Sequence, residues 1–140
     1  MIRIQNYVRA ESLEEAYRLN QNKRNRILGG MLWLKMSDIA VPTAIDLSAL
    51  GLNEIEETEE EFSIGAMVTL RQLELHEGLN AYAQGAVAKA VHDIVGVQFR
   101  NMATVGGSIW KAITRNKTKT ATLNSSRIPM NKKTATEGVD

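Results

Sequence analysis

The sequence contains no cysteine, and this absence excludes several kinds of chemistry. Within these 140 residues there is no disulfide, no thiol nucleophile and no iron–sulfur cluster held by cysteine. Long apolar runs are also missing, since the longest falls far short of the run of about 20 residues that crosses a bilayer. Residues 1–5 lack the basic and then apolar pattern of a secretion signal, so we expect a cytoplasmic protein with no membrane contact.

Familiar catalytic motifs are missing as well. The sequence has neither the G-x-G-x-x-G dinucleotide motif, nor a G-x-x-x-x-G-K-[ST] phosphate loop, nor a G-x-S-x-G nucleophile turn. The only histidines, His76 and His92, lack neighbours at metal-ligand spacing, so we predict surface or helix positions and no metal site. Five glutamates crowd one segment, where we predict a solvated hairpin tip and not an acid–base pair: Glu56, Glu57, Glu59, Glu60 and Glu61.

Composition divides the chain into a body and a tail. Apolar residues make up 44% of the sequence and charged residues 24%, the balance of a globular protein. Residues 1–110 hold 10 Lys or Arg and 14 Asp or Glu, whereas residues 111–140 hold 7 and 2. The tail is also rich in Thr, Asn and Ser, so we predict a disordered basic segment. Contact of this segment with nucleic acid is the weaker alternative.

The first half of the sequence predicts a small α/β lobe with parallel strand pairing. Ser12 and Glu15 have the spacing of a helix capping box. The predicted elements are a strand at 2–8, a helix at 12–21, a strand at 26–28, a brief helix at 31–36 and a strand at 44–47. We place the boundary of this lobe near Gly51.

The second half has a different pattern. Strands are predicted at 54–57 and 61–65, joined by an acidic turn, and Thr69 is expected to cap a helix that runs to Leu75. A longer helix is predicted over 81–95, ended by Gly96. Its apolar stripe is assigned to the core: Ala83, Val87, Ala90, Val91 and Ile94.

Two glycine pairs, Gly29-Gly30 and Gly106-Gly107, each follow a short apolar segment. Glycine permits close approach of the backbone to a ligand, and successive amides in a bend form an anion site. A tight turn without a ligand explains the same pattern. Spacing alone therefore leaves both interpretations open.

Four segments together resemble a known family. The segments are Ile27-Leu28-Gly29-Gly30-Met31-Leu32-Trp33-Leu34-Lys35, Ala44-Ile45-Asp46-Leu47-Ser48, Ser63-Ile64-Gly65-Ala66-Met67-Val68-Thr69-Leu70 and Gln98-Phe99-Arg100-Asn101-Met102-Ala103-Thr104-Val105-Gly106-Gly107-Ser108. In this order they are similar to the FAD-binding domain of molybdopterin dehydrogenases, which include xanthine and carbon monoxide dehydrogenases. The last segment is similar to the family's R-N-x-A-T-x-G-G-N signature.

The resemblance implies an α+β fold of two small α/β lobes, the PCMH-like flavin domain. Residues 1–50 would form the N-terminal FAD-binding lobe and residues 51–110 the second lobe, with 111–140 as the tail. The two glycine turns would hold the FAD diphosphate between them. The residues carried over as FAD contacts are Leu28, Gly29, Gly30, Met31, Leu32 and Trp33, followed by Ala103, Thr104, Gly106, Gly107 and Ser108.

The family's role is electron relay. The resemblance implies that electrons reach FAD from an iron–sulfur subunit, which receives them from a molybdenum-cofactor subunit, and then pass to NAD or another acceptor. Trp33 and Trp110 follow the glycine pairs and would border either the cofactor or ordinary packing. Arg100 and Asn101 are expected to brace the second loop through hydrogen bonds to backbone, in preference to contacting the flavin.

The sequence departs from the family pattern at three places. Met31-Leu32 stand where the family often has Thr-Asp, which leaves the backbone to bind, and Ser108 replaces an Asn. We also expect the resemblance to end near Trp110, so that the second lobe is incomplete. The alternative function is therefore a truncated, non-catalytic fragment that acts at most as an interaction module.

Overall fold

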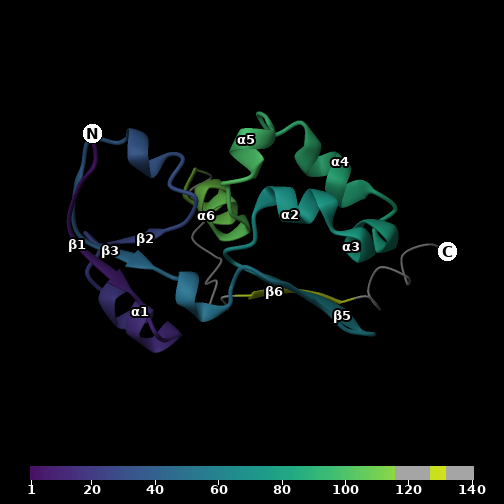
Figure 1. The fold of residues 1–140 in the computed structure, drawn as a ribbon, viewed down its shortest axis with the longest axis horizontal. Coiled ribbons are helices and arrows are strands. Elements are labelled where there is room, and N and C mark those ends of the chain that lie inside the picture. The colour runs from purple at the N-terminus through teal and green to yellow at the C-terminus, as the bar shows by residue number, and fades with distance from the viewer. Residues whose placement is uncertain (116–126, 132–140) are drawn as a thin grey trace. The chain divides into compact units, whose positions relative to one another are not determined.

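The computed structural model describes residues 1–115 and 127–131, with side chains described through residue 110. The chain divides into two compact units, Met1–Gly51 and Leu52–Asp140, and each is described by itself (Figure 1). Both combine helices with a three-stranded sheet.

The first unit is built around the parallel sheet β1-β3-β2, with strands β1 (Arg3–Arg9), β2 (Arg26–Leu28) and β3 (Ala40–Asp46). Both edge strands run parallel to the central strand β3, in the registers Arg3↔Ala40 and Ile27↔Ile45. Two short 3₁₀ helices, η1 (Leu34–Met36) and η2 (Ser48–Leu50), flank β3 along the chain. The predicted parallel α/β lobe is confirmed.

Helix α1 (Leu13–Asn20) connects β1 to β2 and lies against the sheet (Figure 1). The Oγ of Ser12 accepts a 3.1 Å hydrogen bond from the Glu15 amide, which confirms the predicted cap. The Glu15 carboxylate accepts from the Glu11 amide at 2.9 Å, one residue before the position that a capping box uses. Ala16 is the residue of α1 that is buried.

Strand β3 begins four residues earlier than the predicted start at residue 44. Pro42 makes this part of the strand hard to predict from sequence. Proline has no amide hydrogen to donate to a neighbouring strand and is therefore rare in central strands. In the structure β2 pairs only with residues 44–46, beyond the proline. Val41, Ala44 and Ile45 are fully buried and form the centre of the first core.

The second unit contains the antiparallel sheet β4-β5-β6, with β4 (Ile55–Glu57), β5 (Glu61–Gly65) and β6 (Arg127–Asn131). The predicted hairpin around the acidic turn is confirmed, since β4 pairs antiparallel with β5. At the turn, the Thr58 amide donates to the Glu61 carbonyl oxygen at 2.9 Å.

The prediction of a disordered segment from residue 111 is wrong for part of its length. Residues 111–115 continue α6 (Val105–Arg115), and residues 127–131 form β6, which pairs with the second edge of β5. Pro129 is compatible with β6 because the strand lies at the edge of its sheet. Composition missed this strand because its partner lies more than 60 residues away in the sequence. The remaining tail, 116–126 and 132–140, lies outside the described residues.

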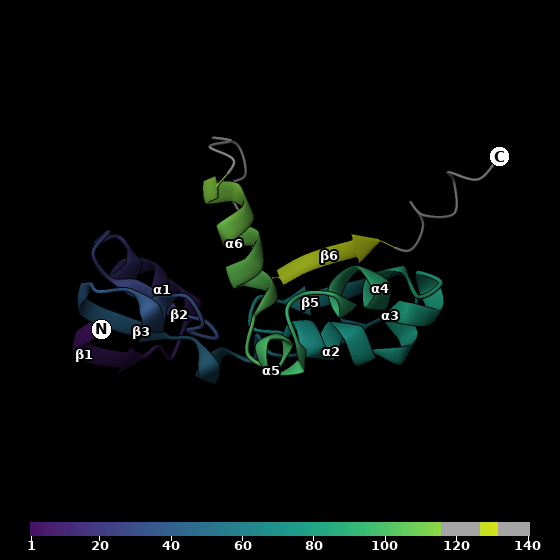
Figure 2. The ribbon, with the colours of Figure 1, turned by 90° about the horizontal axis from the view of Figure 1, so that it is seen from above.

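Helices of the second unit gather on one side of β5 and β6 (Figures 1 and 2). They are α2 (Leu70–Leu75), α3 (Glu77–Tyr82), α4 (Ala86–His92) and α5 (Val97–Arg100). Thr69 caps α2 as predicted, with a complete capping box shared with Gln72. Phe62, Val68 and Leu79 are fully buried at the centre of this unit.

The single helix predicted over 81–95 is wrong, because the structure has α3 and α4 with a break between them. Gln84 and Gly85 both adopt positive φ, 51° and 78°, which ends the first helix. The side chain of Asn80 secures the break, since its Oδ1 accepts from the Ala88 amide at 2.8 Å. In the predicted stripe Val91 is buried, whereas Ala90 is exposed on the new helix.

Among the described residues, no helix combines the length and the apolar character needed to cross a membrane.

Candidate functional site

The first glycine segment lies directly after β2 in the first unit. Gly29 and Gly30 end the strand, and Met31 follows with a φ of 57°, in the left-handed region. The Met31 carbonyl oxygen then accepts from the Lys35 amide at 3.0 Å, which starts the turn into η1. The bend therefore places its left-handed residue at methionine, one position after the glycine pair.

The backbone amides of this bend are available to a ligand. Within the described part of the chain, no acceptor is present for the amides of Gly29, Gly30, Met31 and Leu32. Buried or half-buried amides normally find an acceptor, and Gly30, Met31 and Leu32 are half-buried. A run of unpaired amides in a bend with a left-handed residue is a typical anion site. This donor set fits a phosphate group.

The second glycine segment lies in the second unit, at the start of α6. Thr104 caps this helix, since its Oγ1 accepts from the Gly107 amide at 3.2 Å. The Val105 amide donates to the Val68 carbonyl oxygen and the Gly106 amide to the Ala66 carbonyl oxygen, both at 2.9 Å. We expected the glycine amides to serve as phosphate donors, but the structure uses them within the chain. The polar groups that this segment still offers are the Thr104 amide, the Thr104 hydroxyl hydrogen and the exposed Ser108 hydroxyl.

Two glycines explain how the similar segments fit together. A Cβ on Gly106 would lie 2.9 Å from the Ala66 carbonyl oxygen, so only glycine allows α6 to start against this turn. A Cβ on Gly65 would overlap the Leu52 carbonyl oxygen in the same way. Thr69 and Thr104 form an antiparallel bridge beside them. The segments around residues 65–69 and 103–107 are therefore one interlocked backbone structure.

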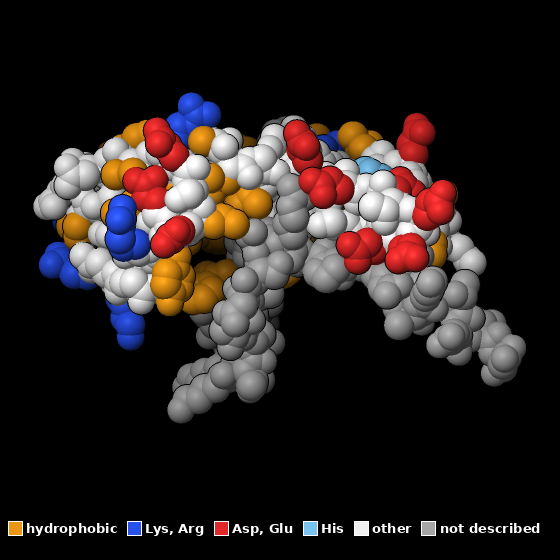
Figure 3. All heavy atoms as spheres, turned by 90° about the horizontal axis from the view of Figure 1, so that it is seen from below, with side chains coloured by type: hydrophobic (Ala, Val, Ile, Leu, Met, Phe, Trp, Pro, Cys, Tyr) orange, Lys and Arg blue, Asp and Glu red, His pale blue; other side chains and the backbone are white. Residues whose placement is uncertain are grey.

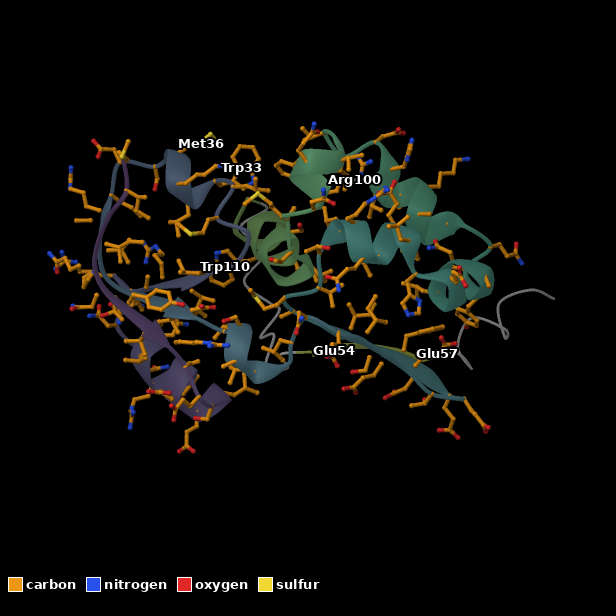
Figure 4. The ribbon with its side chains drawn as sticks, viewed as in Figure 1. Trp33, Met36, Glu54, Glu57, Arg100 and Trp110 are labelled. Atoms are coloured by element: carbon orange, nitrogen blue, oxygen red, sulfur yellow. The ribbon has the colours of Figure 1, made fainter. Side chains whose placement is uncertain are left out.

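Arg100, which precedes the second glycine segment, has a buried side chain (Figure 4). Arg100 is 4% exposed, and its Nε donates to Glu74 Oε2 of α2 at 3.0 Å. Its Nη1 donates to the Ile94 carbonyl oxygen at 3.2 Å. Arg100 does bond to backbone, but at Ile94, upstream of the second loop that it was expected to brace, and the Glu74 carboxylate is an additional partner that the sequence did not reveal. The separation of 26 positions between the two makes this pairing invisible to local spacing.

Glu74 is the most perturbed acid of the described residues. Hydrogen bonds from Arg71, then from His92 and Arg100, lower the pKa of Glu74 from 4.5 to about 2, against the opposing effect of desolvation. The Arg71–Glu74 pair has i,i+3 spacing on α2, a signal that the sequence did contain.

His76 and the two tryptophans have different environments in the structure. His76 caps α3, because its Nδ1 accepts from the Leu79 amide at 3.0 Å, and its ring meets Phe62 edge-on. Both tryptophans are exposed, Trp33 at 58% and Trp110 at 66%, so neither is a core residue of its unit. Trp33 and the exposed Met36 lie close together around η1 (Figure 4).

Asp46 ends β3 within the second similar segment. The Tyr7 hydroxyl donates to its carboxylate, and the Ser48 amide donates at 2.9 Å. The hydrogen bond to Asp46 raises the pKa of Tyr7. Partial burial opposes the change, but bonds from Tyr7 and Ser48 lower the pKa of Asp46. These bonds join the ends of β1 and β3.

The second unit has two further surface features, an open groove and an acidic face. An open groove of about 510 Å³ in the second unit is lined by Asn53, Glu54, Ile55, Arg71, Gln72, Leu75 and His76. Acidic side chains gather on one face of this unit (Figure 3), with Glu54 and Glu57 marked in Figure 4. In residues 1–115 and 127–131, no group of three or more His, Asp or Glu is arranged to hold a metal ion.

Residues 2–130 match the family model described as the FAD binding domain in molybdopterin dehydrogenase. The chain belongs to this family. The FAD-binding domain thus extends well beyond Trp110, and the expectation that the family pattern ends there is wrong. As a member of the family, the chain is an FAD-binding domain of the molybdenum-hydroxylase type. The family pattern after Trp110 is hard to recognise from sequence because residues 111–130 contain few large apolar residues.

Solved structures with the same fold include two carbon monoxide dehydrogenases. The enzyme of Hydrogenophaga pseudoflava, described as lacking the Mo-pyranopterin moiety of its molybdenum cofactor, is 28% identical with a TM-score of 0.67. It is matched over 76% of this FAD-binding domain and 39% of its own chain. The reconstituted enzyme of Oligotropha carboxidovorans is also 28% identical, with a TM-score of 0.63 over 73% and 38% of the two chains.

Quinoline 2-oxidoreductase of Pseudomonas putida 86 shares the fold, with a TM-score of 0.65 and 23% identity over 74% of this chain and 38% of its own. The FAD-binding domain described here therefore spans about two fifths of the length of these solved chains. No protein of curated function matches its sequence.

Proposed function

We propose that this FAD-binding domain serves a molybdenum-hydroxylase-type oxidoreductase and lies on the path of electrons from an iron–sulfur subunit to NAD or another acceptor. Membership of the family supports the flavin role. The 28% identity to the carbon monoxide dehydrogenase of Hydrogenophaga pseudoflava, whose description names a molybdenum cofactor, supports the type of enzyme. The run of unpaired amides at Gly29–Leu32 is the structural observation that carries the proposal.

Two segments are proposed to contact FAD. They contain Leu28, Gly29, Gly30, Met31, Leu32 and Trp33 in the first unit, and Ala103, Thr104, Gly106, Gly107 and Ser108 in the second. Backbone amides of the first segment would bind the diphosphate, because they lack acceptors in the described chain. In the second segment the hydroxyl groups of Thr104 and Ser108 are the better donors, since the glycine amides already donate within the chain.

The chain's share of the work is binding and orientation. FAD, when bound, supplies the redox chemistry, which no side chain of this protein provides. Because these 140 residues contain no cysteine, a cysteine-ligated iron–sulfur cluster lies outside them. We therefore propose an iron–sulfur subunit and a molybdenum-cofactor subunit as partners.

A titration tests the FAD site directly. Purified chain is titrated with FAD, FMN and riboflavin, and quenching of flavin fluorescence gives the affinity of each. If backbone amides recognise the diphosphate, FAD binds most tightly, riboflavin least, and ADP competes with FAD. Equal affinity for all three flavins, with no competition by ADP, would contradict diphosphate recognition.

The second candidate function is an interaction module without redox activity. It is favoured by the second glycine segment, because the Gly106 and Gly107 amides already donate within the chain and leave fewer donors for FAD. Mixing the FAD-loaded chain with its partner subunits and an oxidisable substrate separates the two candidates. Substrate-dependent bleaching of the flavin absorbance supports electron relay, whereas binding of partners without bleaching supports the interaction module.

A further inference from the structure

The Glu74 carboxylate of α2 is shared by two arginines and a histidine. Arg71 Nη1 lies 2.7 Å from Oε2, Arg100 Nε lies 3.0 Å from Oε2, and His92 Nδ1 lies 2.9 Å from Oε1. The side chains of Glu74 and Arg100 are 6% and 5% exposed, whereas those of Arg71 and His92 are 32% and 69% exposed. Arg100–Glu74 is therefore the interior pair of the cluster, and the side chains of Arg71 and His92 lie at its edge.

Arg100 connects this carboxylate to the segment that precedes the second glycine motif. Its Nη1 donates to the Ile94 carbonyl oxygen at 3.2 Å, directly before Val95, whose φ of 53° is strained for a β-branched residue. Arg100 is also the last residue of α5, and the Ala103 amide donates back to the Phe99 carbonyl oxygen at 2.8 Å. The Arg100 side chain thus holds the start of this segment at Ile94, and the backbone bond from Ala103 to Phe99 closes the turn that follows α5.

The same motif is anchored to α2 by backbone. The Leu70 amide, at the first residue of α2, donates to the Ala103 carbonyl oxygen at 2.9 Å. Glu74 lies one turn further along α2, so the side-chain contact and the backbone contact hold α5 against the same helix. Movement of Arg100 would therefore be transmitted to Ala103 and Thr104.

Stability alone is a poor explanation for this pair. Taking two charges out of water costs about as much as their attraction returns, and an apolar pair of similar volume is often as stable. The planar guanidinium instead holds several acceptors in one fixed geometry, which lysine cannot reproduce. Position is what the Arg100–Glu74 pair supplies.

We propose that Arg100, held by Glu74, is a positioning residue for the FAD-binding segment Ala103–Ser108. The inference rests on the proposed function, because it concerns the same FAD site. Arg100 acts by fixing the backbone that carries Thr104 and Ser108, and no contact of Arg100 with the flavin is invoked.

Paired substitutions on the full chain test this role. Arg100→Gln and Arg71→Gln each remove one arginine from the same carboxylate, but only Arg100 also holds the Ile94 carbonyl oxygen. The dissociation constant for FAD and the thermal unfolding midpoint are measured for both. We expect Arg100→Gln to weaken FAD binding about tenfold, as for loss of other groups that orient a binding site. Arg71→Gln should change it by no more than about twofold, the scale of a partly exposed ion pair.

Arg100→Lys separates position from charge. Lysine keeps a positive charge beside Glu74 but cannot also reach the Ile94 carbonyl oxygen in the same geometry. We expect the thermal unfolding midpoint of this variant to stay close to that of wild type, while its affinity for FAD is still weakened. In wild type, the amides of residues 104–108 should also exchange with deuterium more slowly than in either Arg100 variant.

Each outcome decides between explanations. Equal loss of FAD affinity in Arg71→Gln and Arg100→Gln, in proportion to their unfolding midpoints, would show a general stabilising role and overturn the inference. Unchanged FAD affinity in both Arg100 variants would overturn it as well, while the proposed function stands. Failure of the wild-type chain to bind FAD would instead overturn the proposed function and this inference together.

Discussion

The Gly106 amide donates a 2.9 Å hydrogen bond to the Ala66 carbonyl oxygen, and the two backbones touch at this point. The contact joins the start of α6 to the turn that follows β5. Two of the four family-like segments are thereby bonded to each other, and one of them carries predicted FAD contacts. Gly106 is therefore required for the packing of these two segments, whether or not a ligand is bound.

Substitution of this glycine should destabilise the second unit. The Cβ of Gly106→Ala would lie 2.9 Å from the Ala66 carbonyl oxygen and 3.1 Å from the Ala66 Cβ. We expect a loss of about 1–3 kcal/mol in the free energy of unfolding, the usual cost of overpacking. Urea unfolding measures it. Gly96→Ala is the matched control, because its Cβ would meet only the flexible Gln98 side chain at 3.4 Å. Equal effects of the two alanines would contradict the packing argument.

Relief of backbone strain at Val95 should stabilise the protein. Val95 is 80% exposed and has a φ of 53°, a conformation that asparagine tolerates far better than a β-branched residue. We expect Val95→Asn to raise the free energy of unfolding by about 1 kcal/mol. Val97→Asn, in the helix α5, provides the control and should give no gain. Thermal unfolding that showed both variants to be destabilised alike would argue against strain at Val95.

Acid should weaken the fold through Glu74. Because its pKa is lowered from 4.5 to about 2 in the folded chain, its ion pairs stabilise the protein above pH 4.5. That contribution is lost as the pH falls from about 4.5 towards 2, where the folded carboxylate also takes up a proton. Urea unfolding of wild type and Glu74→Gln at several pH values measures this. The variant should be less stable at neutral pH, and the difference should shrink in acid. Parallel curves would refute the assignment.

The bend at Met31 should control FAD affinity. Its φ of 57° costs a β-branched residue about 1–2 kcal/mol more than glycine. Met31→Val should therefore displace the amides of Gly29–Leu32 and weaken FAD binding about tenfold. Met31→Gly adopts the same φ without strain and should bind FAD at least as well as wild type. Flavin fluorescence quenching compares the two, and tighter binding by Met31→Val would rule out a role for this conformation.

Much of the local structure could be predicted from residue spacing. Ser12 and Thr69 cap the helices that the sequence assigned to them, and the hairpin before Gly65 forms as expected. These features depend on interactions within a few residues, which sequence spacing records directly. The four similar segments also identified the family, because their order and composition do not depend on the details of packing.

Tertiary structure decided what local spacing could not record. The stripe over 81–95 looked continuous, but Asn80 and the left-handed Gln84 and Gly85 divide it into two helices. β6 forms because β5 has a second edge to pair with, although β6 contains Pro129 and lies in a basic tail.

The candidate site shows the same division. The sequence by itself determined which segments carry the glycine pairs, and its lack of cysteine excluded a cysteine-bound cluster within these residues. Only the folded chain decided that the Gly106 amide is already bonded, while the Gly29–Leu32 amides have no acceptor among residues 1–115 and 127–131. Only folding, too, brought Arg100 to Glu74 across 26 residues. The physical reason is that long-range hydrogen bonds and buried ion pairs depend on residues that only folding brings together, whereas caps and turns depend on residues adjacent in the sequence.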